Sequence, residues 1–220
     1  MDPVVSDPVD LYGDHSSGNC VKALLAAEAS GAVYRWHLID TSIPGTPRDP
    51  RVVALNPSGQ VPALGLPDGR GIGQSNAIVL YLLRDTDLVP DDPFAHAKML
   101  EWMFWEQYSH EPYVAVVRAS VVYRGVAIAD RDPDRVARAE AALDTMERHL
   151  AEHDWFAGDH ASAADIALYP YTRLAHQGGF DLSDRSAITR WIDRCERRFA
   201  SGIEAWKRLG READGKDPIA

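Results

Sequence analysis

The stretch NPSGQVPALGLPDGRGIGQSNAIVLYL, residues 56–82, constrains the fold more than any other part of the chain. Pro62 stands inside an apolar, strand-like run, although proline cannot donate to a sheet ladder. We therefore expect a cis Val61-Pro62 bond, which bends the backbone and exposes the Val61 amide and carbonyl to a ligand. A Pro-Asp-Gly-Arg turn follows, so residues 61–66 and 69–73 should pair as a hairpin.

Gln74 and Ser75 open the amphipathic segment that follows the hairpin. They place an amide, a hydroxyl and the unpaired backbone amides of a helix N-terminus close together. Such a terminus attracts negative charge. The sequence therefore predicts a site for an anionic, peptide-like molecule at this point.

The first 86 residues alternate between strand and helix patterns. Residues 9–15 read as a buried strand, and a helix follows that should end at Ser30, because Gly31 suits the position after a helix. Residues 33–40 alternate with period two, which is typical of a strand. With a short helix before Asn56 and the hairpin, the order is β-α-β-α-β-β-α, which predicts an α/β layer with one mixed sheet.

The composition changes at residues 86–95, TDLVPDDPFA, where prolines and aspartates are typical of a linker. Strand signals almost vanish beyond it, and Ser162-x-x-Asp165 has the form of a helix capping box. We therefore expect three parts: an α/β domain over residues 1–86, a linker over 87–95 and an all-helical domain over 96–220.

The charge and cysteine content exclude several classes of protein. The formal net charge is −10; residues 1–87 carry 6 Lys and Arg against 10 Asp and Glu, and residues 88–220 carry 17 against 23. Two acidic halves do not suit nucleic-acid binding. No apolar run could span a bilayer, the acidic N-terminus is no secretory signal, and Cys20 and Cys195 stand far apart. A cytoplasmic protein without membrane or nucleic-acid partners is expected.

Five motifs, in their order and spacing, carry a family resemblance: LYGDHSSGN, NPSGQVPAL, GQSNAIVLYL, EQYSHEP and WFAGDHASAADIALY. Together they resemble the cytosolic glutathione transferases over residues 9–206. The resemblance implies a thioredoxin-like N-terminal domain that binds glutathione. It also implies a helical domain that forms the pocket for a hydrophobic small-molecule electrophile, and a homodimer.

The resemblance implies that Ser17 is the hydroxyl residue that stabilises the glutathione thiolate, and that the Asn19 amide could have the same role. A free thiol has a pKa of about 8.5, so a hydroxyl donor and a helix N-terminus are needed to favour the anion at neutral pH. Simple helix capping is the alternative for both residues.

The remaining glutathione contacts are also implied by the resemblance. Ser75 would bind the γ-glutamyl carboxylate and Gln74 its amine, while Val61, beside Pro62, would pair with the cysteinyl backbone. Gln60 stands where relatives often carry Lys, so it can contact the glycyl end without adding charge. Arg48 is then the better partner for that anion, unless it is only a solvated loop charge.

Tyr108, Tyr113 and Arg118 are the candidates for the electrophile pocket, with core packing or a dimer contact as the alternative. His149 and His153 have metal-ligand spacing but no third ligand, so no metal is expected. No cofactor is expected beyond glutathione as co-substrate.

A glutathione transferase is thus the first interpretation. A glutathione-dependent disulfide reductase or isomerase is one alternative, although Lys22 stands where the isomerases carry Arg. A non-catalytic binding protein on the same fold is the other. Such proteins often lose the hydroxyl and the amide-Ser pair that this chain keeps. The second substrate is not predicted.

Overall fold

The computed structural model describes residues 7–41 and 48–219. The chain divides into two compact units. The first joins Met1–Thr86 with Phe199–Ala220, and the second is Asp87–Arg198. The last helix of the chain therefore belongs with the α/β unit, whereas the division made from sequence placed it in the helical domain.

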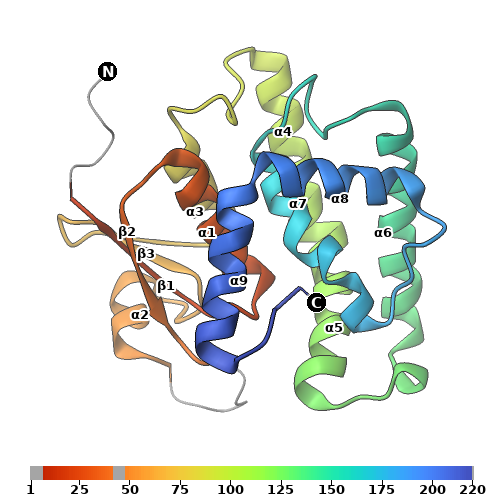
Figure 1. Ribbon diagram of the computed structural model, residues 1–220, viewed down its shortest axis with the longest axis horizontal. Helices are drawn as coiled ribbons and strands as arrows, with labels where there is room; N and C mark the ends of the chain where they lie inside the picture. The colour runs from red at the N-terminus through yellow and green to blue at the C-terminus, as the bar shows by residue number, and fades with distance from the viewer. Residues whose placement is uncertain (1–6, 42–47, 220) are drawn as a thin grey trace. The chain divides into compact units, whose positions relative to one another are not determined.

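The first unit contains a four-stranded sheet (Figure 1), and the strand order within it is β2-β1-β3-β4. β1 (Val9–Gly13) pairs in parallel with β2 (Tyr34–Leu38), and the crossover between them is α1 (Gly18–Ser30). β3 (Ala63–Gly65) and β4 (Gly71–Gly73) form the hairpin, and β3 is antiparallel to β1. The mixed sheet predicted from the sequence is thus confirmed.

Helices cover both faces of this sheet (Figure 1). α1 packs against α3 (Ser75–Leu83), and α2 (Pro50–Leu55) lies against the β3–β4 hairpin. α9 (Ala200–Asp214) packs on α1. The two helices approach closely at Gly202, because a Cβ there would lie 2.7 Å from Leu25 Cδ2. The burial of Trp206 on this side explains why α9 joins the first unit.

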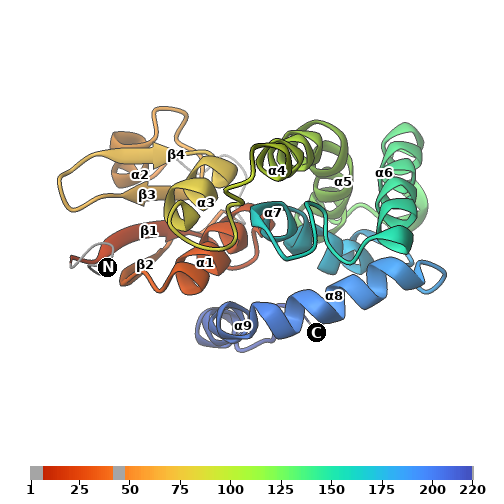
Figure 2. The same ribbon diagram turned by 90° about the horizontal axis from the view of Figure 1, so that it is seen from above.

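The second unit is helical throughout its ordered elements (Figure 2). Its elements are α4 (Pro93–Trp105), the π-helical turn η1 (Glu106–His110), α5 (Glu111–Arg124), η2 (Ile128–Asp130), α6 (Pro133–Glu152), α7 (Ala163–Arg173), η3 (Ala175–Gly178) and α8 (Ser186–Arg198). α7 is the central element, since every residue from 163 to 172 is buried.

The predicted capping box begins α7 and is confirmed. The Ser162 side chain accepts from the Ala164 amide, and Asp165 accepts from the Ser162 amide at 2.8 Å. Asp165 also receives the Trp191 indole N–H at 2.9 Å and the Phe156 amide at 3.3 Å. One buried carboxylate therefore ties the start of α7 to α8 and to the loop before it.

Candidate active site

Ser17 lies between β1 and α1, at the N-cap of the helix. The turn is closed by the Ser17 amide, which donates to the Asp14 carbonyl at 3.1 Å. Ser17 has the extended backbone of an N-cap (φ −89°, ψ 116°), but its hydroxyl makes no hydrogen bond to the helix amides. The Ser17 side chain therefore does not cap the helix, and this observation argues against a merely structural role for the serine.

Cys20, one turn into α1, is buried. Burial raises the pKa of its thiol to about 12, against hydrogen bonds from the Asp14 backbone and the Ser17 side chain that lower it. Nucleophilic cysteines need the thiolate. Cys20 is therefore a core residue rather than a redox group, although it stands beside the candidate catalytic loop.

Asn19 and Ser75 are brought together from the starts of two helices. The Ser75 hydroxyl donates to Asn19 Oδ1 at 3.2 Å. Ser75 is 5% exposed and is the first residue of α3, where no acidic side chain occupies the first turn. The first turn of α1 is thereby linked to the positive end of α3.

Gln74, just before α3, has an unusual backbone. Its φ of 67° is positive, and it is the one non-glycine residue with positive φ among residues 7–41 and 48–219. Its side chain makes no capping hydrogen bond. A non-glycine residue held in this region costs about 1–3 kcal/mol and is typical of ligand-binding positions. The position therefore supports a binding role better than a capping role.

The loop before β3 has the predicted geometry. The Val61-Pro62 bond is cis, as expected. The buried Asn56 orders this loop: its Nδ2 donates to the Gln60 carbonyl at 2.8 Å, and its Oδ1 accepts from the Ser58 hydroxyl at 2.9 Å. Gln60 itself is exposed.

Arg48 is exposed and lies over the same loop. A Cβ at Gly59 would meet Arg48 Cδ, so the Arg48 side chain lies directly over Gly59. Gly59 also has a φ of 64°, which favours glycine. The aliphatic part of the Arg48 side chain thus lies at Gly59, the residue before Gln60. Arg48 and Gln60 must lie this close together if both are to contact the same end of a ligand.

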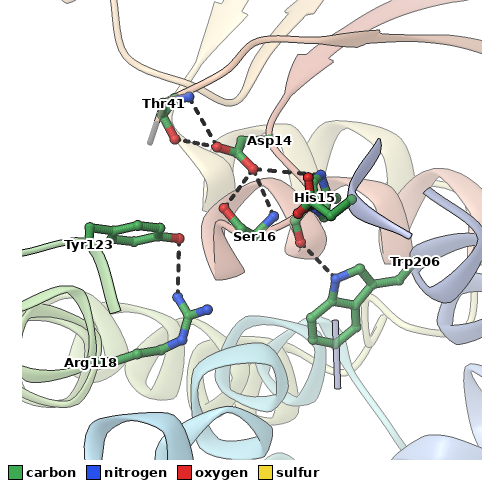
Figure 3. Close-up of polar contacts among 8 residues, drawn as sticks. Asp14, His15, Ser16, Thr41, Arg118, Tyr123 and Trp206 are labelled. Atoms are coloured by element: carbon green, nitrogen blue, oxygen red, sulfur yellow. Dashed lines mark hydrogen bonds and ion pairs between the residues drawn. The ribbon is translucent and has the colours of Figure 1, made fainter. Parts of the chain in front are cut away.

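Asp14 and His15 were not singled out from the sequence, yet they hold the Ser17 loop (Figure 3). Asp14 is 3% exposed; its Oδ1 accepts from the Ser16 hydroxyl at 2.7 Å, and its Oδ2 accepts from the Thr41 amide at 3.1 Å. His15 is held by α9, whose Trp206 Nε1 donates to the His15 carbonyl at 2.8 Å. An acidic residue after an apolar strand is the only local signal that could have pointed to Asp14.

The three pocket candidates in the second unit have different surroundings. Tyr108, on η1, is 82% exposed. The Tyr113 hydroxyl accepts from Arg138 at 3.0 Å. Arg118 is 4% exposed and donates through Nε to Gln177 at 2.9 Å.

Arg118 also has a neighbour that the sequence did not indicate. Its Nη1 lies 3.5 Å from the Tyr123 hydroxyl, one turn along α5 (Figure 3). Tyr108 and Tyr113 have one charged neighbour in common, Arg138, which interacts with both phenol groups.

Within the described residues, no group of three or more His, Cys, Asp or Glu side chains could hold a metal ion. No helix in the same part of the chain is long and apolar enough to cross a membrane.

A four-stranded mixed sheet with a ligand loop before a helix, joined to a helical unit, defines a thioredoxin-like fold with a helical extension. Residues 16–85 match the family described as "Glutathione S-transferase, N-terminal domain", and residues 127–194 match "Glutathione S-transferase, C-terminal domain".

Known proteins agree with these matches. A glutathione S-transferase from Pseudomonas fluorescens Pf-5 is 39% identical over 86% of this chain and 95% of its own, with a TM-score of 0.81. A second, from Xanthobacter autotrophicus Py2, is 38% identical over 86% of this chain and 92% of its own, with a TM-score of 0.79. The glutathione S-transferase-like protein LUC7 from Fusarium is 29% identical over 82% of this chain and 85% of its own. The chain belongs to the glutathione S-transferase family.

Proposed function

We propose that this protein is a glutathione transferase in which Ser17, aided by Asn19, stabilises the glutathione thiolate. The observation that carries the proposal is the hydrogen bond between Ser75 and Asn19. It joins the candidate thiolate loop to the candidate γ-glutamyl site, and it does so at the positive ends of α1 and α3, where an anionic tripeptide would be stabilised twice.

The reaction begins with loss of the glutathione thiol proton to solvent. A hydroxyl donor and a helix N-terminus favour the resulting anion and lower the thiol pKa from about 8.5. The sulfur then attacks an electrophilic carbon and forms a C–S bond, while a leaving group departs or an activated double bond takes up the electron pair. No metal or further cofactor takes part.

Binding uses the remaining residues of the first unit. The Ser75 hydroxyl turns from Asn19 to the γ-glutamyl carboxylate, which also receives a backbone amide, and Gln74 accepts from the amine. Val61 pairs with the cysteinyl backbone, and Arg48 with Gln60 binds the glycyl carboxylate. A hydrophobic electrophile binds at the helical unit, for which Tyr108, Tyr113 and Arg118 remain our candidates.

The assembly we propose is a cytoplasmic homodimer. Phe94 and Phe104 on α4 are 75% and 71% exposed, and Tyr108 follows on η1. Three exposed aromatic side chains on consecutive helical segments are typical of a protein–protein contact. This contact would also account for the exposure of Tyr108, so the dimer and the pocket compete for this residue.

Two experiments test the transferase. The ultraviolet absorbance of bound thiolate is followed against pH, and turnover is measured with a panel of electrophiles and with a hydroxyethyl disulfide. Ser17→Ala should raise the bound thiol pKa by one unit or more and lower the rate at pH 6.5 about tenfold. Asn19→Ala should act in the same direction.

Ser30→Ala, at the opposite end of α1, is the matched control and should change neither quantity. Turnover of the disulfide alone would favour the reductase. Glutathione binding without turnover of any compound would favour the non-catalytic protein. If neither Ser17→Ala nor Asn19→Ala shifts the pH titration of the bound thiolate, the proposed mechanism is wrong.

A further inference from the structure

His15 lies two residues before Ser17 in the sequence and forms hydrogen bonds with α9. Its carbonyl accepts from Trp206 Nε1 at 2.8 Å, and its Nε2 lies 2.8 Å from Asp214 Oδ2. Both partners belong to α9. His15 and Trp206 are buried, so the bond between them is shielded from water, and an unpaired His15 carbonyl would be costly.

Asp214 has a charge that does not suit its position. It is the last residue of α9, where the helix carbonyls concentrate negative potential and a cation is preferred. Its carboxylate nevertheless points to His15, whose other ring nitrogen, Nδ1, lies 3.8 Å from the Asp14 carboxylate. The ring is therefore bracketed by two carboxylates from opposite ends of the sequence.

An open groove of about 330 Å³ lies beside the ring, lined by His15, Trp36, Leu38, Leu209, Glu212 and Ala213. The ring itself is buried, and on this side α9 supplies both of its hydrogen-bond partners, Trp206 for the carbonyl and Asp214 for Nε2. These two bonds are the specific contacts that orient the loop against α9.

We infer that α9 positions the thiolate-stabilising loop through His15, with Trp206 and Asp214 as the positioning residues. The inference rests on the proposed function, since it concerns the same loop. The His15 backbone leads directly into the turn that the Ser17 amide closes on Asp14. A displacement of His15 therefore moves the Ser17 hydroxyl relative to the sulfur, and rates are sensitive to displacements of about 1 Å.

Trp206→Phe and Asp214→Ala test the inference. Phenylalanine keeps the aromatic packing but loses the N–H donor, and alanine removes the carboxylate that bonds the His15 ring. Each should raise the bound thiol pKa by about half a unit and lower kcat at pH 6.5 about threefold. Since the loss is in thiolate population, kcat should return to the wild-type value at high pH. Glutathione affinity should change less than twofold.

Glu204→Gln is the matched control, because it breaks the 2.7 Å ion pair with Arg211 on the same helix without touching the loop. It should leave the pH profile unchanged.

A second test changes the ring itself. His15→Gln can still donate near the Nε2 position, so it should recover part of the rate at pH 6.5 that His15→Leu loses. Thermal melting identifies any variant that does not fold. Asp214 is 58% exposed, so Asp214→Ala decides the question if the Trp206 variant is unfolded.

Amide hydrogen exchange at Ser16 and Ser17 provides a readout that needs no thiolate chemistry. Exchange should become faster in Asp214→Ala and stay unchanged in Glu204→Gln. If both α9 variants keep the wild-type pH profile and exchange rates while Ser17→Ala shifts the profile, the positioning role is wrong. If Ser17→Ala also leaves the profile unchanged, the proposed function fails, and the exchange rates alone decide whether α9 holds the loop.

Discussion

Ser17 and Asn19 share the first turn of α1 but have different neighbours. The Ser17 hydroxyl lies beside the Cys20 thiol, whereas Asn19 Oδ1 receives the Ser75 hydroxyl. Loss of Ser17 should therefore affect the thiolate alone. Loss of Asn19 should also disturb the γ-glutamyl end, because Ser75 loses a partner that positions its hydroxyl.

Ser75→Ala should weaken glutathione affinity by about 1–3 kcal/mol, the range for hydrogen bonds to a charged group. Titration calorimetry measures this directly. Ser30→Ala is a suitable control, because that hydroxyl bonds to the Ala27 carbonyl at the opposite end of α1. Unchanged affinity in the Ser75 variant would place the γ-glutamyl carboxylate elsewhere.

Gln74→Gly should increase stability and reduce glutathione binding together. Glycine adopts a φ of 67° without steric cost, so relief of strain should exceed the added entropy of the unfolded chain by about 1 kcal/mol. Gln74→Ala keeps the strain and loses the amide, so it should bind as weakly but gain no stability. Urea denaturation and calorimetry on both variants separate the two effects. A Gly variant less stable than the Ala variant would contradict this account.

Local signals predicted the residues whose partners are near in sequence. A proline inside a strand was enough for the cis Val61-Pro62 bond, and the hairpin turn was enough to place Ser75 at a helix start. His15 and Trp206 were missed for a different reason. His15 takes its partners 191 and 199 residues further on, and no periodicity or turn signal reports a contact at that separation.

At the level of elements, α7 depends on one buried acid. Burial raises the pKa of Asp165 to about 6, from an ordinary value of 3.8, against hydrogen bonds from Trp191, Ser162 and Phe156 that lower it. The folded protein therefore holds this proton more tightly than the unfolded chain. The resulting stability is fully present below about pH 4 and is lost as pH rises through about 6.

The free energy of unfolding of the wild type, relative to Asp165→Asn, should therefore rise by about 1 kcal/mol between pH 7 and pH 5. The asparagine variant does not titrate, so changes at other groups cancel in the comparison. Urea denaturation at several pH values measures the difference. A relative stability that falls over this range would show that the hydrogen bonds, rather than burial, control the ionisation.

The sequence predicted which elements form better than where they pack. Gly31 ends α1 with a φ of 69°, and the strands are shorter than predicted only at their ends. The sequence placed residues 96–220 in one all-helical domain without separating α9 from the helices before it. An amphipathic pattern indicates that one face of a helix is buried, but it does not indicate which element covers that face. For this reason α9 was placed with the helical domain.

For the whole molecule, light scattering at micromolar concentration should give about twice the chain mass of 24.3 kDa. Phe104→Glu should shift this mass toward one chain, because a carboxylate is costly in a closed apolar contact. Phe104→Leu keeps the apolar surface and serves as the control. A single-chain mass for the wild type would rule out the homodimer and make Tyr108 available to the electrophile.

The division of the first unit between the two ends of the chain has a consequence during synthesis. Residues 87–198 must leave the ribosome before the helix that fastens His15 exists. At about 5–20 residues per second, this interval is on the order of 10 s. During that time the nascent α/β part has its sheet but not α9, and the α1 surface that α9 will cover, including Leu25 opposite Gly202, is open to chaperones. Maturation of the candidate glutathione site is thus expected to wait until α9 has been synthesised.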